Sequence, residues 1–289
     1  MKTITATRVL TGEPLASLLN KKVDDHSPML IEEYPTMVVD SLTNNPVLLL
    51  AKGEPEDSRI LTAAAVEHSK HYGGGVVRAG GMRSRSATFG FSGPAPQMQR
   101  PAPTASAWAY QNPEGHAVIA NYAATLHKVL NDYGPAEIVA RHSEVKQLLH
   151  PDWRLGNTCW TSGIVNDTAN LYYHYDKNNV LDTWSAMIVL RAGVSGGFLH
   201  VADYDLTLPC NHGDILYFAG MSLVHGVTPI RVALPGGYRY SIVYYSIKKF
   251  LGMPASTVSV ENSQSRQSVL GETLLERQRK TGLLNDKQA

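Results

Sequence analysis

Residues 171–179 read LYYHYDKNN, and they place a His-x-Asp motif, His174 and Asp176, at the end of an apolar and aromatic run. In an extended chain, side chains two positions apart point to the same face. The imidazole and the carboxylate can therefore enter one cavity. We expect both to be ligands of a metal ion.

The same motif occurs three times in the chain, so the motif alone decides nothing. Its copies are His150–Asp152, His174–Asp176 and His212–Asp214. A proline inside the first copy indicates a turn after a helix, and the third copy lies in a glycine turn that leads into a strand. Only the middle copy follows a run that predicts a strand.

The third ligand is predicted to be His225, which follows a strand, a glycine-containing turn and a short apolar run. His200 is the competing candidate, but it lies in the middle of a predicted strand, where a structural histidine is at least as common. Two imidazoles and one carboxylate form the facial triad that holds Fe(II) in oxygenases and leaves positions open.

Downstream of the third ligand, Arg239-Tyr240-Ser241 suggests a site for a carboxylate. Arg239 and Ser241 share one face of a predicted strand. A guanidinium binds a carboxylate through two hydrogen bonds, and a hydroxyl can add a third. Arg231 could compete for this role, but it follows Pro229 at a strand end and is expected to be exposed.

The wider pattern predicts an α+β fold, with helices followed by many short strands that form a jelly-roll core. Helices are expected at 57–70, 114–133 and 136–149, and the clearest strands at 186–190, 197–201, 215–218 and 238–246. We expect a single domain, 1–289. Within it, 1–157 holds helices, strands and a basic loop region, 158–250 the jelly-roll core and 251–289 a C-terminal tail, with a helix from Ser265 to Lys280.

Composition gives only weak limits on function. Hydrophobic residues are 43% and charged residues 18%, as in ordinary globular proteins. No apolar run predicts a membrane span or a signal peptide. The two cysteines favour a reducing, cytoplasmic location. The net charge of +1 gives no support to nucleic-acid binding. However, residues 73–105 carry four arginines among glycines and prolines and are expected to form a long basic loop.

Across residues 160–250 the chain resembles the 2-oxoglutarate/Fe(II) dioxygenases, and within them the TET/J-binding-protein branch, which oxidises 5-methylpyrimidines in DNA. The resemblance rests on HYDKNN (174–179), VSGGF (194–198), GDILYF (213–218) with the following Gly220 and His225-Gly226, and RYS (239–241). It implies a jelly-roll fold, Fe(II), 2-oxoglutarate as co-substrate, O2 and a flipped methylated base in DNA. The stretch RSRSATFG (83–90) is similar to a loop of DNA-acting relatives.

The resemblance also implies roles for single residues. His174, Asp176 and His225 would bind Fe(II), and Arg239 with Ser241 would bind 2-oxoglutarate. Asn179 occupies the position of an asparagine that contacts the base, although Asn178 or a plain turn role explains the motif equally simply. The candidates for contacts with DNA phosphates are Arg78, Arg83, Arg85 and Arg100. The aromatic residues that could stack on a base are Tyr172, Tyr173 and Trp184, although core packing is favoured for Trp184.

Other interpretations of the same residues remain open. The chain lacks the Cys-rich region of animal TET enzymes, which suggests a minimal relative of microbial or viral origin.

A different substrate class is also open. A 2-oxoglutarate-dependent hydroxylase of a small molecule or a protein side chain would fit the low net charge. A non-catalytic, cupin-like binding module and a zinc hydrolase are further alternatives. The sequence leaves open the number of oxidation steps and the oligomeric state.

Overall fold

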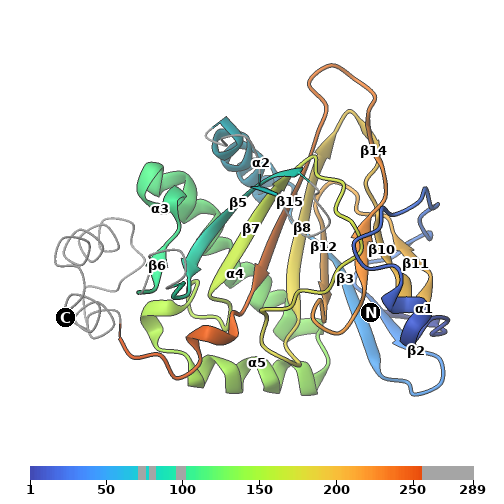
Figure 1. Cartoon of the computed structure of the whole chain (residues 1–289), viewed down its shortest axis with the longest axis horizontal. Helices are drawn as coiled ribbons and strands as arrows, with labels where there is room; N and C mark the ends of the chain where they lie inside the picture. Colours follow the sequence, from blue (N-terminus) through green and yellow to red (C-terminus); the bar gives the residue numbers. More distant parts are fainter. Residues whose placement is uncertain (71–75, 78–82, 96–101, 256–289) are drawn as a thin grey trace.

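A ten-stranded sheet forms the centre of the computed structural model, which describes residues 1–70, 76–77, 83–95 and 102–255 (Figure 1). In spatial order its strands are β1 (Lys2–Ala6), β2 (Thr36–Asp40), β3 (Pro46–Lys52), β12 (Asp214–Phe218), β8 (Ser185–Ala192), β15 (Tyr238–Tyr245), β7 (Ser162–Asp167), β5 (Arg83–Ser92) and β4 (Val76–Val77), with β6 (Thr104–Ala105) beside β5. β1 is parallel to β2, and the other described pairs are antiparallel.

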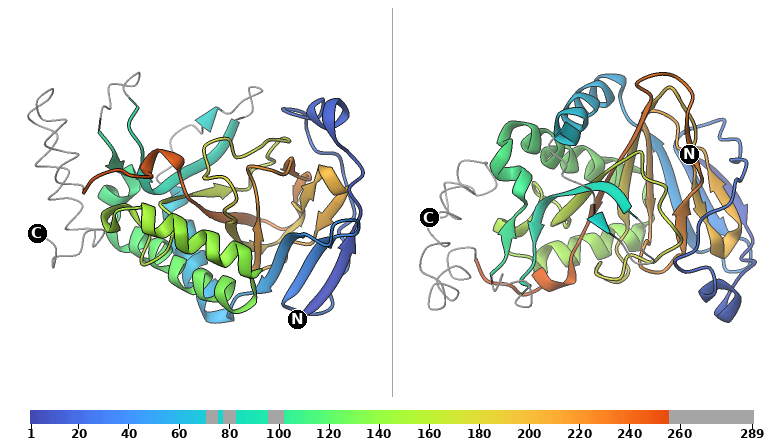
Figure 2. Two further views of the ribbon diagram at one scale, coloured as in Figure 1. Left: turned by 90° about the horizontal axis from the view of Figure 1, so that it is seen from below. Right: turned by 45° about the horizontal axis from the view of Figure 1, so that its top comes forward.

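Two small sheets face the β1 to β8 side of the large sheet (Figures 1 and 2). One contains β11 (Leu206–Leu208), β10 (Leu199–Val201) and β13 (His225–Val227), and the other pairs β9 (Val194–Gly196) with β14 (Ile230–Val232). A core lies between the layers, where Leu216 and Phe218 of the large sheet meet Leu199 and Val201 of β10. This arrangement of two facing antiparallel layers is that of a jelly roll.

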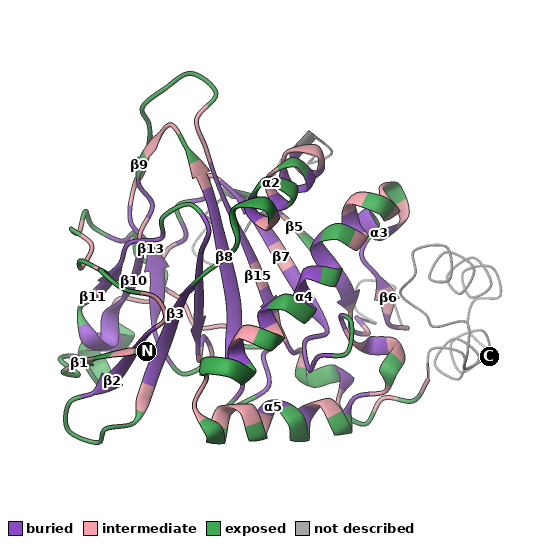
Figure 3. Ribbon diagram, turned by 180° about the vertical axis from the view of Figure 1, so that it is seen from behind, coloured by how far each residue is buried: buried purple, intermediate pink, exposed green. Residues whose placement is uncertain are grey.

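Helices cover the opposite face of the large sheet (Figure 3). They are α2 (Pro55–Lys70), α3 (Ala107–Gln111), α4 (Pro113–Tyr133) and α5 (Ala136–Leu148); α1 (Gly12–Ala16) lies beside the small sheet, and the short 3-10 turns are η3 (Pro151–Trp153), η4 (Ala202–Tyr204) and η5 (Lys248–Phe250). In α4, Ile119, Leu126 and Leu130 are fully buried, as helical spacing requires. None of the helices described is both long and apolar enough to span a membrane.

The alternation of side chains along each strand decides which side chains face the helices and which face the small sheets. On β15, Tyr240, Ile242 and Tyr244 belong to the core under the helices. Ser241 and Val243 point to the other side, into a cavity between the sheets. A shift of one residue would exchange the two sets, so the apolar pattern of this strand fixes which side chains reach the cavity.

The predicted helices and strands are confirmed, with ends shifted by one or two residues in most cases. The long basic loop predicted for 73–105 was wrong, because residues Arg83–Ser92 form β5 and pair with β7. Serine is not among the residues enriched in strands, and the serines of this stretch concealed the alternation in which Phe89 and Phe91 fill the core. The predicted helix from Ser265 to Lys280 lies outside the described residues.

Candidate metal centre and cavity

His174, Asp176 and His225 come together as the sequence predicted. The Nε2 atoms of His174 and His225 lie 3.6 and 3.9 Å from Oδ1 of Asp176. The two imidazole rings are 4.3 Å apart between centroids and inclined by 52°. Three ligand atoms of this kind around one point are a suitable site for a divalent transition metal.

The backbone fixes the orientation of both imidazoles. Nδ1 of His174 lies 2.7 Å from the carbonyl oxygen of Tyr172, and Nδ1 of His225 lies 2.9 Å from that of Leu223. A carbonyl oxygen only accepts, so each Nδ1 carries the proton when the ring is neutral. Each Nε2 then presents its lone pair toward Asp176, which is the arrangement seen in metal-bound histidines.

The distant parts of the triad are joined by the main chain. The backbone N–H of His174 donates to the carbonyl of His225, and the N–H of His225 donates back to His174, at 2.9 and 3.1 Å. His225 itself begins β13, whose pairing with β10 holds it in the small sheet. The ligand set therefore depends on the small sheet being in place.

Asp176 is held by two further residues. Its backbone N–H donates to the carbonyl of Gly220 at 2.9 Å. The side-chain amide of Asn179 donates to Oδ2 of Asp176 at 3.3 Å and to the hydroxyl of Ser185 at 3.1 Å. These bonds leave Oδ1 directed at the two imidazoles.

Arg239 is fully buried on β15, and apart from the nearby thiol of Cys210 no hydrogen-bond partner for its three side-chain nitrogen atoms is found among the described residues. Burial lowers the pKa of its guanidinium, although the nearby thiol of Cys210 opposes this effect. An uncompensated buried charge is costly. Gly197 makes room for it, because a Cβ at Gly197 would come 2.6 Å from Cδ of Arg239. This arrangement suits a carboxylate brought in by a ligand.

A cavity of about 440 Å³ lies directly at the triad. Ser241, Val243 and Tyr245 of β15 form part of its wall, and the hydroxyl of Ser241 accepts a hydrogen bond from Asn166 at 3.3 Å. The cavity is large enough for a small dicarboxylate and one further group beside the metal ligands.

A second, wider cleft of about 980 Å³ adjoins this cavity, because Tyr172 and Val227 line both. Lys22 and Arg85 bring positive charge to the cleft. Arg85 forms a 3.2 Å ion pair with Asp167, which also lines the cleft. A substrate larger than the inner cavity can therefore lie in the cleft and send one group past Tyr172.

The remaining candidates differ in where they lie. Asn178 is exposed at the cavity rim, and Asn179 is buried under Asp176. Tyr173 and Trp184 are buried in core clusters, so of the three predicted stacking residues Tyr172 is the one that lines the cleft. Of the predicted arginines, Arg78 and Arg100 and the side chain of Arg83 lie outside the described parts of the chain.

The alternative candidates for metal ligands lie away from the triad. His200 bonds to the hydroxyl of Tyr173 at 2.8 Å, away from the triad. His150 accepts from the backbone of Asp152 in η3, and His212 accepts from the backbone of Arg191. Arg231 is exposed and paired with Asp25, as expected.

Two further residues shape the site in ways that the sequence pattern did not predict. Gly220 has no room for a Cβ, because one would overlap the carboxylate of Asp176. Asp203 is buried and accepts from the backbone N–H of Val224 at 2.8 Å, next to His225. Only the glycine carried a signal, as the turn residue between Phe218 and His225.

No protein-family model matches the chain, and no curated protein does. Among solved structures it is similar to NgTET1 in complex with 5mC DNA, with a TM-score of 0.55 and 15% identity over 84% of this chain and 93% of that one. The chain has the double-stranded β-helix fold. This likeness confirms the α+β jelly roll.

Two prolyl hydroxylases are also similar in structure. A prolyl-4-hydroxylase of Pseudomonas putida matches with a TM-score of 0.44 and 11% identity, over 70% of this chain and 93% of that one. A prolyl hydroxylase of Trichoplax adhaerens, in complex with a hypoxia inducible factor peptide fragment, matches with a TM-score of 0.41 and 12% identity, over 70% and 84%.

Proposed function

We propose that this chain is an Fe(II)- and 2-oxoglutarate-dependent dioxygenase that oxidises the methyl group of 5-methylcytosine, or of another 5-methylpyrimidine, in DNA. One observation carries the reaction class. The triad of His174, Asp176 and His225 lies at a cavity that Ser241 lines, and the buried Arg239 points to the same face of β15 as Ser241.

The residues present fit both groups. Nitrogen and oxygen ligands from two histidines and one aspartate suit Fe(II) and leave positions for other ligands. Arg239 would pair with the far carboxylate of 2-oxoglutarate, and Ser241 would add a hydroxyl donor. When bound, Fe(II) and 2-oxoglutarate activate O2 for the insertion of oxygen into a C–H bond.

The protein contributes position and exclusion of water. The carbonyls of Tyr172 and Leu223 hold the proton on Nδ1 of each histidine, so that Nε2 coordinates. Asn179 orients Asp176 from below. Apolar side chains such as Met187, Leu199 and Val243 line the cavity and keep it dry beside the reacting centre.

Three observations support DNA as the substrate. The motif HYDKNN carries the spacing found in the TET branch. The fold is shared with NgTET1, whose structure was solved with 5mC DNA. The outer cleft, with Lys22 and Arg85, has room for a strand whose flipped base passes Tyr172 into the cavity.

A second candidate is hydroxylation of a small molecule or a protein side chain. The charge of the cleft favours it, because Asp167 neutralises Arg85 and the net charge of the chain is only +1. The two candidates predict different salt dependence. DNA binding should weaken steeply with salt, and Arg85→Ala should lower the slope of log K against log salt by about one.

The deciding experiment loads the purified chain with Fe(II) without oxygen and then adds O2, 2-oxoglutarate, ascorbate and duplex DNA that contains 5-methylcytosine. Mass spectrometry measures succinate and the modified nucleosides. His174→Ala is the inactive variant, and His150→Ala is the matched control, since it removes the histidine of another His-x-Asp motif.

A nucleoside that gains one oxygen atom with the wild type and with His150→Ala, but not with His174→Ala, would support the proposal. Succinate without modified nucleoside would keep the reaction class and favour the second candidate. No succinate and no bound iron would refute the enzyme and leave a binding module.

A further inference from the structure

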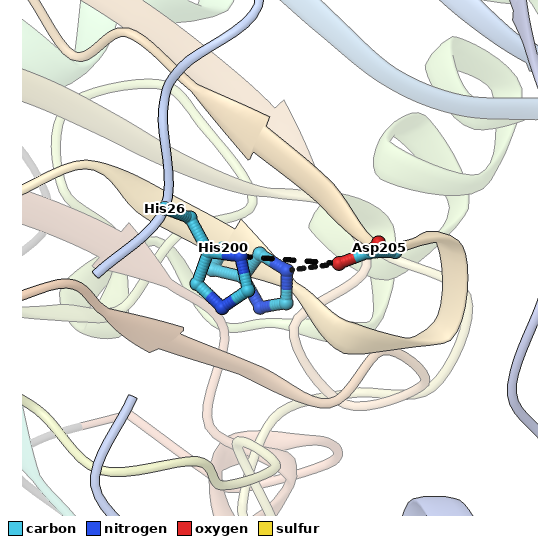
Figure 4. A group of neighbouring side chains, drawn as sticks. All are labelled: His26, His200 and Asp205. Carbon is cyan, nitrogen blue, oxygen red and sulfur yellow. Dashed lines mark hydrogen bonds and ion pairs between the residues drawn. The ribbon is translucent and has the colours of Figure 1, made fainter. Parts of the chain in front are cut away.

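A second group of two histidines and one aspartate lies outside the candidate active site. It consists of His26, His200 and Asp205, whose ligand atoms all lie within 4.8 Å of one another. Figure 4 shows the two imidazoles stacked, with the carboxylate beside them. The ring centroids are 4.0 Å apart. Oδ1 of Asp205 lies 3.1 Å from Nε2 of His200 and 4.0 Å from Nδ1 of His26.

The group is on the opposite face of the small sheet from the triad. In the antiparallel pair of β10 and β13, Val201 lies opposite His225 and His200 lies opposite Gly226. Residues opposite each other point to the same face, and successive residues alternate. The side chains of Val201 and His225 therefore enter the interior, and His200 faces outward.

The outward face is covered by the segment that follows α1. Val23 lies so close to Gly226 that a Cβ there would come 2.5 Å from it. Three residues later the segment brings His26 over His200, and the N–H of Met29 then donates to the carbonyl of Thr207 at 2.9 Å. His26 thus comes from a different part of the chain than His200 and Asp205. A metal ion bound by all three would link the segment after α1 to the small sheet.

His200 is set up as a metal ligand. It is almost fully buried, and its Nδ1 lies 2.8 Å from the hydroxyl of Tyr173. That hydroxyl can donate to Nδ1 or accept from it. A metal at Nε2 requires the proton on Nδ1, and Tyr173 can accept it, as the outer partners of metal-bound histidines do.

We propose that His26, His200 and Asp205 form a second metal site, which takes Zn2+ and fastens the segment after α1 to the small sheet. Tetrahedral Zn2+ with nitrogen and oxygen ligands at 2.0–2.2 Å places neighbouring ligand atoms about 3.3 Å apart. The separations of 3.1 and 4.0 Å lie on either side of this value. His26 lies on a loop and is partly exposed, and its ring must turn out of the stack with His200 for both imidazoles to reach one ion. The fourth position is open to water.

The test removes the first triad, so its outcome does not depend on the proposed function. The full chain with His174→Ala and His225→Ala is stripped of metal and titrated with Zn2+ by calorimetry. Bound zinc is then counted after gel filtration. We expect one Zn2+ per chain and a rise in Tm when it binds. Adding His26→Ala should reduce bound zinc at least tenfold and abolish the rise, and adding His150→Ala should change neither.

Two further variants guard against misfolding. Asp205→Asn keeps the size of the side chain and removes its charge, and it should also lose the zinc. The titration of His174→Ala alone serves if the double variant does not fold. Failure of the triad-deficient chain to bind zinc, or zinc binding that persists in both His26→Ala and Asp205→Asn, would overturn the proposal and leave a hydrogen-bonded histidine pair.

Discussion

Gly220 lies directly against Asp176: its carbonyl accepts the backbone N–H of Asp176 at 2.9 Å, and no Cβ fits between it and the carboxylate. Gly220→Ala should therefore displace the carboxylate and lower Fe(II) affinity at least tenfold, with a parallel loss of turnover. Iron affinity by fluorescence quenching or calorimetry measures the effect.

Gly156→Ala is the control for that substitution, because nothing lies within 4 Å of its added Cβ. Its φ of +55° should cost about 1 kcal/mol of stability, without a change in iron affinity. Equal iron affinity in Gly220→Ala and the wild type would contradict the role given to Gly220.

Arg239→Met should separate stability from function. Removing a buried charge without a partner should leave the free energy of unfolding unchanged or raise it by about 1 kcal/mol or more. The same change should raise KM for 2-oxoglutarate at least a hundredfold, because the far carboxylate of 2-oxoglutarate loses a guanidinium that can donate two hydrogen bonds to it. Thermal unfolding in the presence of Mn2+, with and without 2-oxoglutarate, tests both, since only the wild type should gain Tm when 2-oxoglutarate is added.

Arg231→Met is the matched control, because Arg231 lies exposed in a surface ion pair with Asp25. It should change KM and Tm little, as surface pairs contribute at most about 1 kcal/mol. A large loss of stability in Arg239→Met without co-substrate would show that the protein itself satisfies this guanidinium.

Asn179→Ala distinguishes support of Asp176 from contact with a base. The amide bonds to Asp176 and Ser185, so its loss should weaken iron binding several-fold and reduce substrate-independent succinate formation. Contact with the base alone would leave succinate formation intact and reduce only the yield of modified nucleoside. Both products, measured in one reaction, decide between the two roles.

Buried histidines should make the fold sensitive to acid. Burial lowers the pKa of His116 to about 4 and that of His142 to about 3. The unfolded chain binds these protons below pH 6.5, and the folded chain does not. The contribution of each neutral, buried histidine to the free energy of unfolding is therefore complete above pH 6.5. It is lost as the pH falls toward 4, by about 1.4 kcal/mol per pH unit for each histidine.

Urea unfolding at pH 7.5 and pH 5 measures this loss. His116→Gln keeps an acceptor for the backbone N–H of Gly90, which His116 binds at 2.9 Å, and it does not titrate. The variant should lose about 2 kcal/mol less than the wild type between the two pH values. An unchanged loss would mean that His116 is protonated in the folded state.

Local patterns predicted the elements and the grouping of the candidate ligands because the site rests on short-range geometry. His174 and Asp176 are two residues apart on extended chain, and Arg239 and Ser241 share a strand face, so their sequence spacing fixes their side. The structure agrees with the choice of His225 over His200, since the two lie on opposite faces of paired strands.

Other parts depend on contacts that no local pattern carries. β5 is a strand because β7 pairs with it and Phe89 fills the core, despite its serines. The group around His200 needs His26, which belongs to a segment far away in sequence. Asn179 matched a motif for contact with a base. In the structure its amide is buried and donates to Asp176 and to Ser185, and no sequence motif indicated these bonds.

The main-chain bridge between His174 and His225 has a consequence for biosynthesis. A nascent chain that ends before His225 contains two of the three ligands but lacks the strand that aligns the first. If the triad binds Fe(II) as proposed, metal binding would require β13 and would therefore follow its release from the ribosome. Iron content would then report completed folding, and truncated products of translation should lack iron.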